Sequence, residues 1–162
     1  MPANPTNPLP PVAEDPRALL LQAAGFAQAQ QYDRAEAAYM ALIERAPDFA
    51  IARFQLGLLQ FTSARPAVAS LTWKPLDRLD DSHPLKLFKQ GFEHLALDQF
   101  DAALAKLQEG IACNTENEPL NRDMAMVIER IRQVDRPKPS SDGEADGTAD
   151  DHILVSTYRK LN

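Results

Sequence analysis

Residues 85–111 read LKLFKQGFEHLALDQFDAALAKLQEGI. Apolar side chains recur in this stretch at helical spacing in two series, one ending at Leu95 and the other beginning at Phe100. Only a few polar residues separate the two series, so the pattern predicts an antiparallel helix pair. Gly91 is a small residue where one helix must approach the other closely, and Ala103 is expected opposite it.

The pair recurs earlier in the chain. Residues 31–35 (QYDRA) match residues 99–103 (QFDAA). Ala69 stands midway between Ala35 and Ala103, and Gly57 precedes Gly91 by the same half-interval. Self-similarity at a period of about 34 residues predicts stacked helix–turn–helix units.

These positions resemble the tetratricopeptide repeat, with three units in one phase over roughly residues 16–117. The first unit matches at Leu19, Ala23, Phe26, Ala35, Tyr39 and Pro47. The third matches at Leu87, Gly91, Ala103 and Leu107, with Thr115 in place of the proline. The second keeps Gly57, Ala69 and Trp73 but carries Arg53 and Gln60 where bulky apolar residues are usual.

The expected fold is all-α: three tetratricopeptide-like units and a capping helix over residues 16–134. Helices are expected near 16–30, 33–46, 48–62, 66–75, 84–97, 100–113 and 120–134. Pro47 should end the second helix, and Pro75 should shorten or kink the fourth. The last helix carries one apolar stripe and is charged elsewhere, as a helix covering the end of a repeat stack requires.

The flanks differ in composition from the repeats. Residues 1–15 are proline-rich and predicted to be an extended, mobile arm, and residues 135–151 form an acidic linker. Residues 152–162 gather apolar side chains and are expected to be a binding segment, as a helix or a strand, acting in cis or in trans: Ile153, Leu154, Val155, Tyr158 and Leu161.

The resemblance implies a concave groove lined by the first helix of each unit. Its predicted partner-binding residues are Leu20, Ile51, Phe54, Leu58, Phe61, Leu85, Phe88, Phe92 and Leu95. They are apolar, so the groove should prefer an apolar helix or strand over a charged terminus. The alternative is that these residues are ordinary core. An exposed stripe of this size would need cover from a partner, a second copy or the chain's own segment 152–162.

Composition narrows the function class. The 162 residues carry a net charge of −6, which argues against a nucleic-acid partner. One cysteine excludes an internal disulfide, and no secretion signal or membrane-spanning run is apparent, so a cytoplasmic location without membrane insertion is expected.

No catalytic set, metal-ligand spacing or cofactor motif stands out, so a non-enzyme is predicted. The resemblance implies a protein–protein interaction module, either an adaptor or a client-shielding chaperone. The alternatives are an assembly subunit of a fixed homo- or hetero-oligomer, with self-association in the homo-oligomeric case, and a regulatory subunit of an enzyme.

Overall fold

A computed structural model describes residues 15–135, and every regular element in that range is helical. The elements are α1 Pro16–Gln28, α2 Tyr32–Arg45, α3 Ala50–Thr62, α4 Pro66–Trp73, the 3-10 helix η1 Lys74–Arg78, α5 Pro84–Leu95, α6 Phe100–Cys113 and α7 Glu118–Asp135. The all-α prediction is confirmed for this part of the chain. The predicted arm, linker and apolar segment (1–14 and 136–162) lie outside it.

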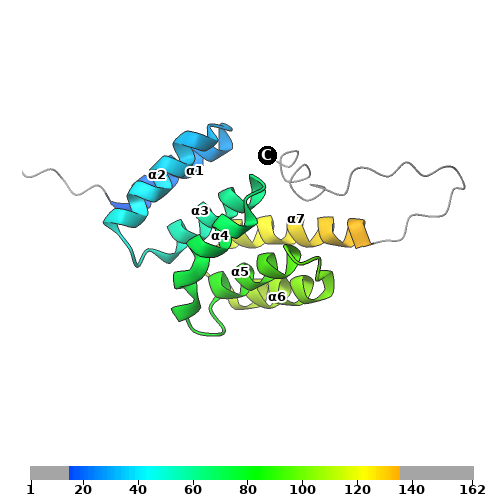
Figure 1. Ribbon diagram of the computed structural model, residues 1–162. Helices are drawn as coiled ribbons and strands as arrows, with labels where there is room; N and C mark the ends of the chain where they lie inside the picture. Colours follow the sequence, from blue (N-terminus) through cyan, green and yellow to red (C-terminus); the bar gives the residue numbers. More distant parts are fainter. Residues whose placement is uncertain (1–14, 136–162) are drawn as a thin grey trace, which may run out of the picture.

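The helices pack as neighbouring pairs. The most extensive contacts join α1 to α2, α3 to α4 and α5 to α6, while α2 contacts α3 and α7 packs on α6. The α1–α2 pair lies at one end of the row and the α5–α6 pair at the other, with α3 and α4 between them (Figure 1). None of the helices between residues 15 and 135 is long and apolar enough to cross a membrane.

The three turns inside these pairs have the same backbone conformation. Each places one residue in the left-handed region, and the next N–H donates to a carbonyl five residues earlier, which is a Schellman-type helix end. The left-handed residues are Gln30, Ala64 and Asp98, with φ of 59°, 62° and 55°. They are evenly spaced along the chain at the same interval as Ala35, Ala69 and Ala103, so the period seen in the sequence recurs in the backbone.

Small residues lie where the paired helices cross. Ala35, Ala69 and Ala103 are fully buried. A Cβ added at Gly91 would lie 2.8 Å from the Leu107 side chain and 3.4 Å from the Ala103 carbonyl oxygen, so this crossing leaves no room for a larger residue.

The fourth helix is short, as Pro75 predicts. It ends at Trp73, and the 3-10 helix η1 follows it directly. The Trp73 indole Nε1 donates a 3.0 Å hydrogen bond to the Phe54 carbonyl oxygen, and its ring stacks on Phe54 and Phe61 with centroids 5.9 and 6.1 Å apart. Trp73 therefore anchors α4 to α3.

Two apolar clusters make up the core, and α3 contributes to both. Leu56 and Leu59 face the first cluster, with Ala23, Ala35 and Tyr39 of the α1–α2 pair. The opposite face of α3 joins the second and larger cluster, which draws side chains from α4, η1, α5, α6 and α7. Helix α3 is thus buried on two sides, which explains why its sequence is apolar on two faces.

Candidate binding site

Seven of the nine predicted groove residues lie in the second core cluster, each at most 9% exposed: Phe54, Leu58, Phe61, Leu85, Phe88, Phe92 and Leu95. The cluster also contains the apolar stripe of α7: Leu120, Met124, Val127, Ile128 and Ile131. The expected exposed aromatic stripe is therefore corrected. The aromatic residues are buried in one cluster with apolar side chains of α7. This is possible because the apolar residues of α7 follow helical spacing and the helix packs beside α6.

The remaining two predicted residues line an open pocket. Leu20 of α1 and Ile51 of α3 are half-buried, and both face a pocket of about 430 Å³ bounded by α1, α3, the start of α7 and edges of α2. Leu58 reaches the same pocket from the core side. Its volume falls in the range of about 300–1,000 Å³ that is typical of sites for small ligands or a few side chains.

Two large apolar side chains stand exposed at the edges of this pocket. Leu21 on α1 is 73% exposed and Met126 on α7 is 45% exposed. Leu20, Ile51 and Val127 continue the apolar lining inward. Exposed apolar residues that adjoin a concave apolar lining indicate a binding surface more strongly than scattered ones do, because covering a continuous apolar surface is favourable.

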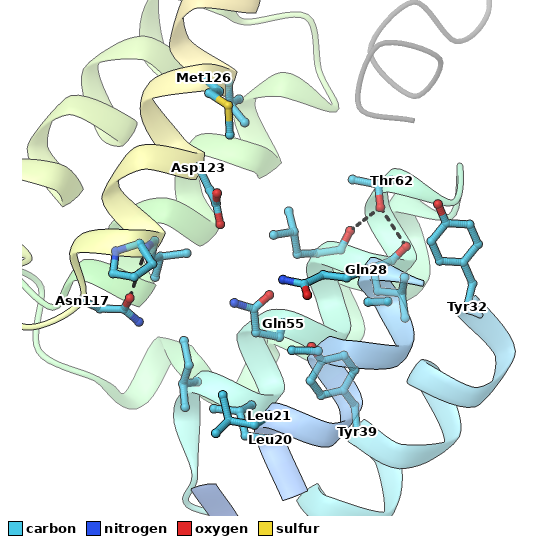
Figure 2. A pocket seen from close by; sticks show the side chains of 18 of the residues that line it. Leu20, Leu21, Gln28, Tyr32, Tyr39, Gln55, Thr62, Asn117, Asp123 and Met126 are labelled. Atoms are coloured by element: carbon cyan, nitrogen blue, oxygen red, sulfur yellow. Dashed lines mark hydrogen bonds between the residues drawn. The ribbon is translucent and has the colours of Figure 1, made fainter. Parts of the chain in front are cut away.

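One charged residue faces the pocket. Among the residues that line it, only Asp123 of α7 carries a charge, and no ion pair or hydrogen bond within residues 15–135 engages its carboxylate. Burial raises the pKa of Asp123 above its ordinary value, an effect that nearby Arg122 partly opposes. Figure 2 shows this carboxylate directed into the pocket, with the amides of Gln28 and Gln55 across from it.

None of the other polar groups that line the pocket carries a charge, and two of them already make hydrogen bonds. The Thr62 hydroxyl donates to the carbonyls of Leu58 and Leu59, and the Asn117 side chain accepts from the Leu120 N–H at the start of α7 (Figure 2). Burial raises the pKa of Tyr39 to about 12, so its phenol stays protonated at neutral pH. Asp123 is therefore the one charged group among the described residues of the pocket that can contact a ligand, and the amides of Gln28 and Gln55 lie across from it.

This chemistry suits binding through apolar contact with one point of charge recognition. The pocket is lined by a single carboxylate, three side-chain amides and no cysteine or histidine. Across residues 15–135, no group of three or more His, Cys, Asp or Glu side chains is arranged to hold a metal ion. The five predicted binding residues of segment 152–162 lie outside the described part of the chain.

No protein-family model matches the chain, and no curated protein shows significant similarity to it.

The most informative residues of the pocket are ones that the sequence pattern did not predict. Leu21, Asp123 and Met126 were not singled out, although Pro119, Asp123 and Met126 share one side of α7 beside its buried stripe. The sequence feature that could have indicated the pocket is a methionine and a single acidic residue on this second side of the last helix.

Proposed function

We propose that this chain is a protein-interaction module of the tetratricopeptide type, acting as an adaptor or client-shielding chaperone rather than an enzyme. The pocket between α1, α3 and α7 receives an apolar peptide segment. The observation that carries this proposal is the exposure of Leu21 and Met126 on facing walls of a concave apolar pocket.

Two features support the repeat assignment within this proposal. The three turns share a left-handed residue and the same hydrogen bonds, and they recur at equal spacing along the chain. The pocket lies on the side formed by α1 and α3, the first helices of two successive pairs, which is where the resemblance places a ligand. The binding residues differ from those first expected, because the aromatic residues of α3 and α5 are core.

The occupant should be a short apolar segment carrying a basic residue. Apolar side chains would cover Leu21, Met126 and Ile51, and a cation would neutralise Asp123. Gln28 and Gln55 supply amides that donate to or accept from the backbone of a bound segment.

Peptide selection tests this proposal. Short random peptides are selected against the full chain and against the full chain with Ile153, Leu154 and Val155 each changed to Asp, which removes competition from its own apolar segment. Selected peptides should be apolar and basic, and Leu21→Asp should abolish their binding. The matched control is Leu71→Asp, because Leu71 is 76% exposed on α4 and lies outside the pocket.

Two outcomes would count against a peptide-binding pocket. If neither chain enriches a peptide whose binding depends on Leu21, the proposal is wrong. If the purified chain instead forms a stable oligomer that Leu21→Asp dissociates and Leu71→Asp does not, the pocket belongs to a fixed assembly.

A further inference from the structure

We propose that the pocket between α1, α3 and α7 is occupied in the free chain by the chain's own segment 152–162, docked in cis with its basic residues beside Asp123. This inference rests on the proposed function, since it names a resident ligand for the same pocket. It makes the segment an autoinhibitor that a client must displace.

Charge selects this segment from the rest of the chain outside the described range. Residues 1–14 contain one acid, Glu14, and no lysine or arginine. Residues 136–151 contain five acidic residues against two basic ones, so this stretch would on balance be repelled by Asp123. Residues 152–162 contain Arg159 and Lys160 and no acid, so they alone offer an uncompensated cation to a carboxylate without a described partner.

Apolar content points to the same segment. Ile153, Leu154, Val155, Tyr158 and Leu161 make up about half of residues 152–162, whereas residues 136–151 contain no large apolar side chain. The pocket exposes Leu21 and Met126, and the half-buried Leu20 and Ile51 also line it. Only a segment with several aliphatic side chains covers both walls and fills the lining between them.

The intervening chain is long enough. Helix α7 ends at Asp135. At about 1.5 Å per residue, the helix from Asp123 to this end measures roughly 18 Å. Residues 136–151 span roughly 20–25 Å on average as a flexible linker and about 50 Å when extended. The segment therefore reaches the pocket without displacing any helix.

Tethering makes weak docking sufficient. A short flexible linker gives an effective concentration of about 1 mM, so a segment whose free Kd is about 0.1 mM weakens binding of a competing copy roughly tenfold. A contact of this strength keeps the pocket covered in the free chain and still yields to a client of higher affinity.

The test uses a fluorescent synthetic peptide of residues 152–162 and two full-length proteins. One is the unchanged chain, and the other carries Leu154→Asp, Tyr158→Asp and Leu161→Asp. Fluorescence anisotropy should show the peptide binding to the substituted chain, with roughly tenfold weaker binding to the unchanged chain because its tethered copy competes. Adding Leu21→Asp to the substituted chain should abolish binding, and adding Leu71→Asp should leave it intact.

A charge cycle identifies the contact at Asp123. Asp123→Asn should weaken peptide binding roughly three- to tenfold, as should a peptide with Arg159→Gln and Lys160→Gln. When the substituted peptide is bound to the Asp123→Asn protein, the affinity should fall no further than with either change alone, because each change removes the same ion pair. The control Asp101→Asn alters an exposed acid on α6 outside the pocket and should leave affinity unchanged.

Each contrary result has a distinct meaning. Equal peptide affinity for the two chains overturns docking in cis. A wild-type dimer that the three segment substitutions convert to monomer shows docking in trans and also overturns it. If this peptide fails to bind while library-selected peptides bind through Leu21, self-docking is wrong and the proposed function stands. If no peptide binds through Leu21, both are wrong.

Discussion

The indole of Trp73 lies directly against the backbone of Gly57. A Cβ added at Gly57 would be 2.0 Å from Trp73 Nε1, the same nitrogen that donates to the Phe54 carbonyl. Since the indole is 1% exposed and stacked between two phenylalanines, it has no room to move aside. The contact joins α3 to α4 at the centre of the larger core cluster.

Gly57→Ala should therefore destabilise the protein, although alanine is the better helix former. Overpacking of this kind costs about 1–3 kcal/mol, which exceeds the gain of about 1 kcal/mol in helix propensity. Urea denaturation followed by circular dichroism measures the change. The control is Gly25→Ala in α1, where no heavy atom lies within 4 Å of the added Cβ. The free energy of unfolding of that variant should rise by about 0.5–1 kcal/mol. If Gly25→Ala instead lowered it as much as Gly57→Ala does, the packing argument would be contradicted.

The repeated turns predict a stabilising substitution. Ala64 adopts φ 62° at the end of α3, a conformation that costs a non-glycine residue about 1–2 kcal/mol. Ala64→Gly should relieve most of this strain, and after the entropy cost of glycine in the unfolded chain it should stabilise the fold by up to about 1 kcal/mol. The control Ala41→Gly, exposed in the middle of α2, should instead cost about 1 kcal/mol. Thermal unfolding that places both variants below the wild type would refute the assigned turn conformation.

The burial of Phe92 reverses an expectation from the sequence. A charge at an exposed groove position would abolish binding and leave the helices intact. Phe92 is 2% exposed and contacts the Phe54, Phe61 and Trp73 rings, with centroids 5.3–6.4 Å apart. Phe92→Asp should therefore unfold the domain, because a buried unpaired carboxylate costs several kcal/mol. Circular dichroism distinguishes the two cases, and a folded variant that loses only binding would restore the open groove.

Local pattern and long-range packing explain what the sequence could and could not predict. Helix pairs and their small crossing residues follow from spacing inside a single repeat unit, so Gly91, Ala103 and the short α4 were predictable. The cover over Phe54 and Phe88 depends on long-range packing, including the position of α7. The sequence could not predict this cover, because the apolar pattern is the same whether a partner protein or the chain's own helix provides it. The pocket could not be predicted for the same reason, because Asp123 and Leu21 line one pocket only once α7 and α1 have packed in the folded chain.

The ionised carboxylate of Asp123 should lower the stability of the fold while favouring binding of a basic segment. Burial raises the pKa of Asp123 above its ordinary value of 3.8, which means that the folded chain holds the proton more tightly than the unfolded chain. The stability contributed by the protonated form is therefore complete below pH 3.8 and is lost as the pH rises through the raised pKa. At neutral pH the ionised carboxylate is a cost to folding as long as no cation is docked beside it.

In the chain whose segment 152–162 carries Leu154→Asp, Tyr158→Asp and Leu161→Asp, no docked cation offsets the charge, and Asp123→Asn should consequently raise the melting temperature at pH 7. The gain should shrink towards zero as the pH falls below about 4, where the Asp123 carboxyl is also neutral. The same variant weakens binding of the basic peptide, and the two effects together identify a residue retained for recognition rather than for folding. Differential scanning calorimetry across pH 3–7 measures the first effect, with Asp101→Asn on the exposed surface of α6 as the control expected to give no gain. A melting temperature lowered by Asp123→Asn in this substituted chain at pH 7 would show that the carboxylate has a stabilising partner other than segment 152–162, and the charge argument for the pocket would then fail.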